Sequence, residues 1–295
     1  MMRRKSLAKN FSFFQAANGL VMALFCFTTL YPVWYILINS LLESTDALRG
    51  ASLWWPKSFT LDNYYAVFHS GNILNAMLVS VLRTVSATMV HVFFTAMVAY
   101  PLSKTKLIGR KFYMGFGLVT MLFNGGLIPY FLLIQKLKLY NTFLVYVIPA
   151  MFSYYNMLIL RTFFKSMPDS IEESAQVDGA GDFRTFLTIV LPNAKAVLAT
   201  IALFAGVYHW NDQFTGYLFI KKESLMPIQT LLFKVVAENS SAAMQQQALG
   251  SLGRRVAPNS IKFATMVVAT VPILMAYPFL QKYLVQGVML GAIKE

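Results

Sequence analysis

The stretch from Pro168 to Pro192 reads PDSIEESAQVDGAGDFRTFLTIVLP and is a polar island between long apolar runs. Ser170 and Glu173 form a Ser-x-x-Glu capping box, in which each side chain accepts a hydrogen bond from the other residue's backbone amide. A helix is therefore predicted to start there. Gly179 is predicted to end it after about two turns, because glycine tolerates the left-handed conformation that closes a helix.

The small side chains in this helix suggest a docking surface. Ser174 and Ala175 are predicted to give the helix a face with almost no side-chain bulk. Another protein could then approach the helix backbone closely. An ordinary amphipathic connector between two membrane spans is the alternative interpretation.

The composition is that of a membrane protein. Of the 295 residues, 57% are hydrophobic and only 13% are charged, whereas about a quarter of the residues in soluble domains are charged. The net charge is +13, but the basic residues are scattered between apolar runs. Acidic lipid and membrane topology account for this pattern better than nucleic acid does. The single cysteine, Cys26, excludes a disulfide within the chain.

The apolar runs predict an all-α membrane protein with six transmembrane helices, since about 20 apolar residues span a bilayer. The predicted spans are 20–42, 73–102, 112–134, 143–164, 194–219 and 263–284. Residues 1–295 are treated as a single transmembrane domain. An even number of spans places both termini and the polar island on one side. The short loop 103–111 has four basic residues and no acid, which indicates the cytoplasm.

The second and third spans carry residues that are unusual at membrane depth. Arg83 should face the bundle interior or a water-filled cavity and have a partner, because a charge is costly in lipid. It serves either the structure or a substrate path. Asn124 and Tyr130 flank two glycines and a proline, which would bend the third span. Such a break is either a packing kink or a piece of a translocation path.

The fourth and fifth spans add further candidates for a substrate path. Tyr154 and Asn156 lie in the fourth span, and Trp210, Asn211 and Asp212 lie in the fifth. Aromatic rings can cover the apolar faces of a sugar while amides and a carboxylate meet its hydroxyl groups. An aromatic belt at the membrane interface is the alternative.

The chain lacks the motifs of the common enzymes and nucleotide-binding proteins. It contains no GxxxxGK[ST], HExxH or GxSxG sequence, so we expect no catalytic site, no metal and no cofactor bound by this chain. If the chain moves a solute across the membrane, the energy must come from another subunit. An ion-coupled secondary transporter would need acidic residues in the membrane, and Asp212 is the only one within the predicted spans.

The polar island also carries a family resemblance. The run Glu173-Ser174-Ala175, followed by Gly179 and by Ile-x-Leu-Pro at 189–192, resembles the EAA loop of membrane subunits of ATP-binding-cassette (ABC) importers. Ser174 replaces the usual first alanine. The resemblance implies the type I ABC importer permease fold, with residues 168–181 as a cytoplasmic coupling helix that docks on an ATPase. The residues that it implies in coupling are Glu172, Glu173, Ser174, Ala175, Asp178, Gly179 and Ala180.

Two further runs resemble a narrower group. FTLDNY at 59–64 resembles carbohydrate importers, and FNGGLIPYFLLIQKL at 123–137 resembles the branch that handles complex oligosaccharides or polysaccharides such as alginate and aldouronates. The polar stretch 221–260, which has no obvious core of its own, is then an extracytoplasmic loop or a flexible connector. The run QKYLVQGVMLGAIKE at 281–295 resembles the family's C-terminus, which implies that residues 286–295 are a cytoplasmic tail.

The resemblance implies a permease subunit that moves an oligo- or polysaccharide by alternating access, with an acidic one such as alginate among the options. The implied location is the cytoplasmic (inner) membrane, with the N- and C-termini in the cytoplasm. The implied partners are a second homologous permease subunit, a dimeric ATPase that uses ATP and Mg²⁺, an extracytoplasmic solute-binding protein, the saccharide and membrane lipid. An ion-coupled secondary transporter of a small solute is the alternative.

Overall fold

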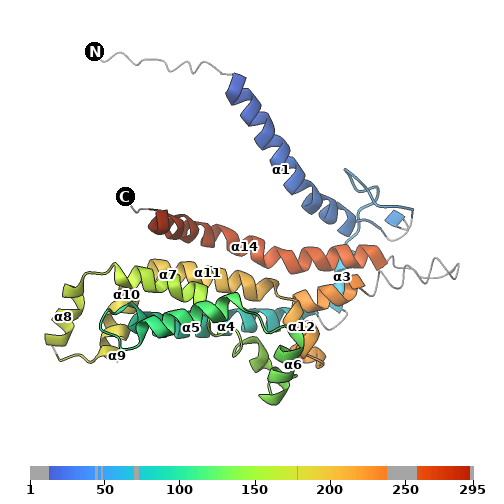
Figure 1. Ribbon diagram of the computed structural model, residues 1–295. Helices are drawn as coiled ribbons and strands as arrows, with labels where there is room; N and C mark the ends of the chain where they lie inside the picture. Colours follow the sequence, from blue (N-terminus) through green and yellow to red (C-terminus); the bar gives the residue numbers. More distant parts are fainter. Residues whose placement is uncertain are drawn as a thin grey trace, which may run out of the picture. The chain divides into compact units, whose positions relative to one another are not determined.

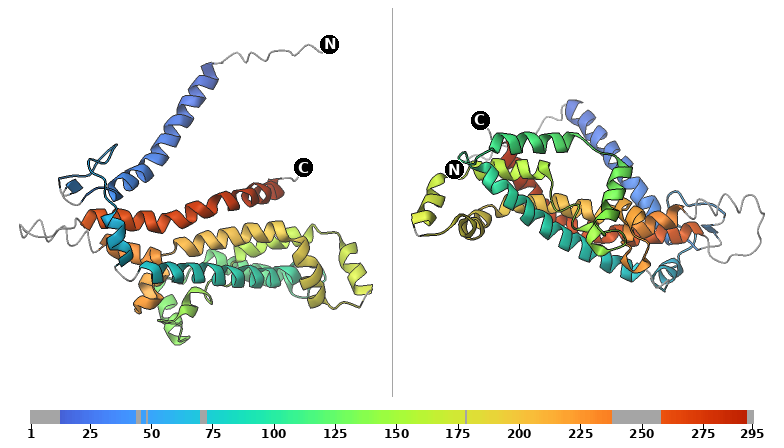
Figure 2. Two further views of the ribbon diagram at one scale, coloured as in Figure 1. Left: turned by 180° about the vertical axis from the view of Figure 1, so that it is seen from behind. Right: turned by 60° about the horizontal axis from the view of Figure 1, so that its bottom comes forward.

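The regular elements of the described residues are all helices in this computed structural model. The described residues are 13–43, 46–47, 49–69, 73–177, 179–237 and 258–292. They belong to two compact units, Met1–His69 with Ser241–Val267 and Ser70–Ser240 with Val268–Glu295. Figures 1 and 2 show the helices of both units.

In the first unit, α1 (Phe13–Ser40) covers most of the first predicted span and begins before it. The end of α1 is fixed by side-chain hydrogen bonds to the segment that follows. The amide group of Asn39 pairs with the backbone of Ser52, at 2.8 Å in both directions. The short helix α3 (Asp62–His69) is held to the same place, because Asn63 donates to the carbonyl oxygen of Ser40 at 3.0 Å.

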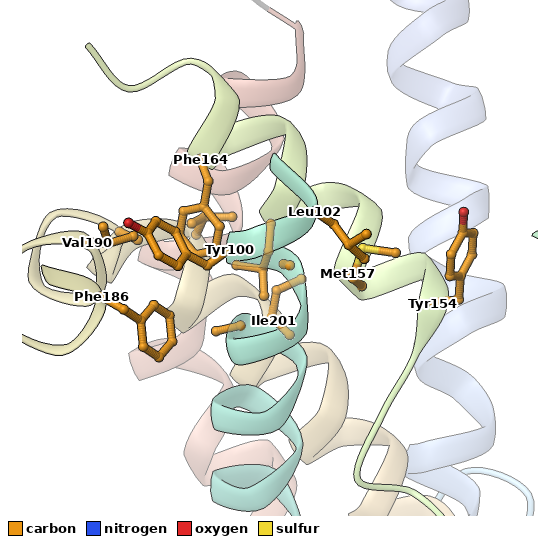
Figure 3. Packing of buried hydrophobic residues seen from close by; sticks show 13 residues of the cluster. Tyr100, Leu102, Tyr154, Met157, Phe164, Phe186, Val190 and Ile201 are labelled. Carbon is orange, nitrogen blue, oxygen red and sulfur yellow. The ribbon is translucent and has the colours of Figure 1, made fainter. Parts of the chain in front are cut away.

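In the second unit, α4 (Ile73–Ser103), α7 (Tyr154–Lys165) and α11 (Lys195–Asn211) pack side by side (Figure 1). Ala96 and Ala99 on α4 are fully buried in the core that these helices share. Figure 3 shows this core, with Tyr100, Met157 and Ile201 among its labelled residues. Small residues at helix contacts allow the backbones to approach closely, as is typical of helices in membranes.

The third predicted span is broken, as its sequence predicts. It consists of α5 (Arg110–Leu122) and α6 (Leu127–Lys136), which are bent by 114° relative to each other. Gly126 lies between them with a φ of 88°, a conformation that favours glycine. The side chain of Asn124 accepts a hydrogen bond from the amide of Gly126 at 2.9 Å. Asn124 therefore stabilises the break itself.

The fourth predicted span is wrong in its first half. Residues 143–146 form only a short 3-10 turn, η1 (Phe143–Tyr146), and the helix α7 begins at Tyr154. Pro149 lies between them and cannot donate a helical hydrogen bond. Ser153 caps the new start, because its side chain accepts from the amide of Asn156 at 3.3 Å.

The fifth predicted span also ends too late. Helix α11 stops at Asn211, and a separate short helix, α12 (Phe214–Phe219), follows. Before α11, residues 182–193 form α9 (Asp182–Thr185), a π-helix (Phe186–Val190) and α10 (Leu191–Asn193). This leading segment is bent by 83° from α11.

The polar stretch 221–260 is more ordered than its composition predicts. After η3 (Glu223–Leu225) it contains the helix Ile228–Ala237, and Ile228 is fully buried. The amide of Ile228 donates to Ser80 on α4 at 2.8 Å. The first part of this stretch therefore packs on α4, and residues 238–257 lie outside the described residues.

The last helix, α14 (Pro258–Ala292), contains the sixth predicted span and continues into the predicted tail 286–295. Two described helices, α1 and α4, are long and apolar enough to cross a membrane, or up to four spans exist if each bent pair counts as one. Helices α7 and α14 occupy the two remaining predicted spans.

We expect Gly117→Ala to destabilise the protein. A Cβ atom at Gly117 would lie 2.0 Å from the Tyr154 ring, whose hydroxyl donates to the carbonyl oxygen of Met114 at 2.6 Å. Overpacking of this kind costs about 1–3 kcal/mol. Thermal unfolding in detergent measures the loss. Gly115→Ala is the matched control, because a Cβ there meets nothing within 4 Å, and equal unfolding temperatures for both variants would contradict the prediction.

Candidate functional site

A cavity of about 400 Å³ lies in the second unit, beside the break before α7. Helices α4, α6, α7 and α11 all contribute to its wall. Its polar lining residues are Arg83, His91, Ser153, Asn156, His209, Asp212 and Thr215. Its aromatic lining residues are Tyr130, Tyr146, Phe152, Phe204 and Tyr208.

The charged groups of the cavity wall neutralise each other. Arg83 is 1% exposed, forms an ion pair with the carboxylate of Asp212, and donates to the carbonyl oxygen of Asp212 at 2.7 Å. Its guanidinium group also lies 4.3 Å from the centre of the Tyr146 ring. The second carboxylate oxygen of Asp212 accepts from the amide of Thr215 at 3.1 Å. The prediction that Arg83 faces inward and has a partner is confirmed.

A second polar pair joins α4 to α7. The Nδ1 atom of His91 lies 2.7 Å from the carbonyl oxygen of Ala150, and the side-chain nitrogen of Asn156 lies 2.8 Å from Nε2 of His91. A carbonyl oxygen only accepts, so Nδ1 carries the proton and, in the neutral ring, Nε2 accepts from the Asn156 amide. His91 thereby fixes the orientation of Asn156 at the cavity wall.

Several aromatic side chains present exposed surface beside these polar groups. Tyr208 is 60% exposed, and Tyr130, Phe152 and Phe204 are each about 40% exposed. The combination of ring faces with hydrogen-bonding groups suits a ligand that has both apolar faces and hydroxyl groups. In the described part of the chain, no three His, Cys, Asp or Glu side chains are grouped closely enough to hold a metal ion.

The cavity brings together half of the predicted path residues. Those that line it are Arg83, Tyr130, Asn156 and Asp212. The others, which do not line it, are Asn124, Tyr154, Trp210 and Asn211. Tyr154 is instead a packing residue against α5, and Trp210 is 9% exposed within α11.

Several lining residues are absent from the predicted set, among them His91, Tyr146, Phe204, Tyr208 and His209. Tyr208 precedes Asp212 by one helical turn, and residues at this spacing lie on the same face of a helix. Helical spacing from Asp212 would therefore have found Tyr208. Asn211 is rotated away from this face, and its side chain donates to the carbonyl oxygen of Val207 in the same helix at 2.9 Å.

A second candidate site is the helix α8 (Asp169–Val177), which lies at the end of the second unit away from α12 (Figures 1 and 2). Its predicted end is confirmed, since Gly179 has a φ of 77° and the amide of Ala180 donates to the carbonyl oxygen of Ala175 at 2.9 Å. The helix begins at Asp169, so Ser170 lies in its first turn rather than before it. Asp178 lies outside the described residues.

The exposed residues of α8 form one stripe. Ser170, Glu173, Ser174 and Val177 are all exposed, and Val177 is 87% exposed. Their positions i, i+3, i+4 and i+7 place them on one helix face. This stripe, defined by these four residues, is the surface of α8 that is free to meet a partner.

The opposite face of α8 is covered by the chain itself. Glu172 is 9% exposed and Ala175 is 6% exposed. The expectation that Ser174 and Ala175 together form an outward face without bulk is therefore wrong, because successive helical residues point about 100° apart. Glu172, which is expected to couple to an ATPase, contacts Tyr100 and Lys104 of this chain.

The comparison with known families settles the class of protein. Residues 65–290 match the family described as the binding-protein-dependent transport system inner membrane component. The chain belongs to this family. It is 37% identical over 275 residues to the polygalacturonan/rhamnogalacturonan transport system permease protein YtcP of Bacillus subtilis, covering 93% of this chain and 95% of that one. Protein LplC of the same organism is 37% identical over 267 residues, covering 90% of each chain.

A solved structure shares the fold of this permease. It comes from a bacterial ABC transporter involved in the import of the acidic polysaccharide alginate, with a TM-score of 0.83 and 26% identity, covering 94% of this chain and 98% of that chain. The type I ABC importer permease fold is thus confirmed. The permease is a transport subunit and not an enzyme. These matches support an ABC importer over an ion-coupled secondary transporter.

We expect Asp212→Asn to destabilise the permease strongly. The substitution leaves Arg83 buried without an opposite charge, and breaking a buried ion pair in this way costs about 3–5 kcal/mol. Thermal unfolding of the detergent-solubilised protein measures the loss. The double variant Arg83→Met/Asp212→Asn should recover part of it, because no unpaired charge remains. Asn211→Ala is the control at the neighbouring position, and a loss as large there would contradict the account.

Proposed function

We propose that this permease carries an oligo- or polysaccharide across the cytoplasmic membrane by alternating access, and that the cavity contacts the sugar rings on their way. The single observation that carries the proposal is the cavity wall, where exposed aromatic rings stand beside Asn156 and the Arg83–Asp212 pair. Rings of this kind stack on the apolar faces of sugars while the polar groups bind hydroxyls. The matches to permeases of saccharide importers support the same substrate class.

An acidic saccharide is the first substrate to test. The solved neighbour belongs to a transporter involved in the import of the acidic polysaccharide alginate. In this structure the guanidinium group of Arg83 is already neutralised by Asp212. A substrate carboxylate would therefore bind Arg83 only by replacing Asp212, and the remaining described groups of the cavity serve hydroxyls and ring faces.

For the partners, we propose that α8 docks on a dimeric ATPase through its exposed stripe. The ATPase uses ATP and Mg²⁺, and this chain binds neither. The ion pair between Glu172 and Lys104 supports a cytoplasmic position for α8, because Lys104 belongs to the basic loop after α4. With α8 on that side, the N- and C-termini and the tail 286–295 are cytoplasmic as well.

The remaining partners follow from the same arrangement. A second, homologous permease subunit completes the saccharide path, and membership in this transport family supports that partner. A solute-binding protein delivers the saccharide to the extracytoplasmic loop 221–260. The membership in a family named for binding-protein-dependent transport supports this partner.

Loss of the exposed stripe should uncouple hydrolysis from uptake. Glu173→Ala removes a charge from the docking surface, and Gly179→Ala strains the helix end, where φ is 77°. We expect transport per ATP to fall in both variants while the ATPase remains active, measured in proteoliposomes with the binding protein and the saccharide. Ser166→Ala, an exposed position in the turn after α7, is the control. Unchanged transport in both Glu173→Ala and Gly179→Ala would overturn the proposed docking.

Loss of a cavity ring should slow uptake without harming assembly. Tyr208→Ala removes a lining ring that is 60% exposed, and aromatic contacts are worth about 1 kcal/mol each, or about fivefold in uptake. The assay is uptake of matched acidic and neutral oligosaccharides by the assembled importer. Tyr155→Ala is the matched control, because Tyr155 is 59% exposed and does not line the cavity. Equal uptake by both variants would count against the cavity as the path.

A further inference from the structure

One buried carboxylate attaches α8 to the end of α4. The Oε2 atom of Glu172 accepts a hydrogen bond from the hydroxyl of Tyr100 at 3.1 Å and forms an ion pair with Lys104. The ammonium group of Lys104 in turn lies 4.8 Å from the centre of the Tyr100 ring. Tyr100 and Lys104 are one helical turn apart, so they present both donors on the same side of the chain.

Tyr100 is itself held from several directions. Its ring stacks on Phe186 with a centroid distance of 5.4 Å and meets Phe164 edge-on at 6.2 Å (Figure 3). Next to it, the guanidinium of Arg161 on α7 donates to the carbonyl oxygen of Leu102 at 2.9 Å. The end of α4 is therefore a fixed point in the packing, and Glu172 ties α8 to it.

Within the described side chains of α8, Glu172 is the one with a recorded hydrogen bond or ion pair to another element. Ser174 bonds only to the carbonyl oxygen of Ile171 in its own helix, and Ala175 contributes apolar packing. The carboxylate of Glu172 thus provides the polar part of the attachment. The exposed stripe on the other face stays free for a partner.

We propose that Glu172 is a positioning residue that makes α8 and the end of α4 move as one rigid body. A displacement imposed on α8 then enters α4 directly. Helix α4 also carries Arg83 in the cavity wall, about 25 Å further along at 1.5 Å per residue. This inference rests on the proposed docking of α8 to an ATPase and names the residue that passes the movement onward.

The test compares variants of the two charged partners in the assembled importer, reconstituted with the ATPase, the binding protein and the saccharide. Glu172→Gln and Lys104→Met should each lower transport per ATP by about two- to thirtyfold, the range for residues that modulate coupling between sites. ATP hydrolysis should persist. The double variant should be no worse than either single variant, because both remove the same contact.

The chain offers a matched control in Lys106→Met, because Lys106 is an exposed lysine of the same loop with no recorded ion pair among the described residues. An unchanged transport-to-hydrolysis ratio in Glu172→Gln would overturn the inference. The inference would also be overturned if the loss of transport per ATP in the double variant equalled the sum of the losses in the two single variants.

A cross-linking experiment distinguishes between two possibilities: α8 and the end of α4 stay together throughout the transport cycle, or their contact must open. In a Cys26→Ser background, Glu172→Cys and Lys104→Cys are joined by a flexible bis-methanethiosulfonate, which forms a reducible disulfide with each thiol and releases sulfinate. Transport per ATP should recover on cross-linking and fall again when the link is reduced. A cross-linked importer that hydrolyses ATP without transport would overturn the inference, because α8 and α4 would then have to separate during the cycle.

The two proposals fail in distinguishable ways. If α8 does not dock on an ATPase, Glu173→Ala and Glu172→Gln both leave the coupling ratio unchanged. If Glu173→Ala uncouples the importer and Glu172→Gln does not, the docking stands and the attachment through Glu172 is wrong.

Discussion

A charged side chain at membrane depth must be neutralised by the protein, and the pairing of Arg83 with Asp212 meets this constraint. The pair joins the middle of α4 to the corner where α11 ends and α12 begins. Asp212 can reach Arg83 because α11 stops at Asn211 instead of continuing. The same corner places Tyr208 and His209 in the cavity wall. One ion pair thus fixes a helix end, a helix contact and the charge balance of the cavity.

The sequence predicts local backbone conformation well, in particular where helices break and end. Gly126 and Gly179 both adopt positive φ values where a break and a helix end were expected. The errors have both local and tertiary causes. The apolar run 143–164 has the composition of a span, yet Pro149 and the cap at Ser153 delay its helix to Tyr154. Composition also hides the buried Ile228 in a stretch that reads as polar.

For the candidate sites too, the sequence locates the segments, whereas tertiary contacts decide which side chains face inward. The sequence identifies α8 and the short polar cluster after α11, but it does not say which face of each turns inward. Glu172 and Glu173 are neighbours of the same type, and only contacts with Tyr100 and Lys104 distinguish the buried one from the exposed one. Asn211 and Asp212 are also neighbours, and Asp212 lines the cavity whereas Asn211 does not. Helical spacing groups residues into faces, whereas the orientation of a face depends on neighbours that are distant in sequence.

Two connections lead from α8 toward the cavity. One passes through Glu172 into α4, and the other follows the chain through the π-helix Phe186–Val190 into α11. Isolated π-helical turns are rare and often occur at functional sites. The two helices that receive these connections also carry Arg83 and the end that presents Asp212. Under the proposed docking of α8, a relative shift of α4 and α11 would act on the ion pair and on the cavity wall at once. This pair of helices is then where a displacement of α8 would change the shape of the cavity.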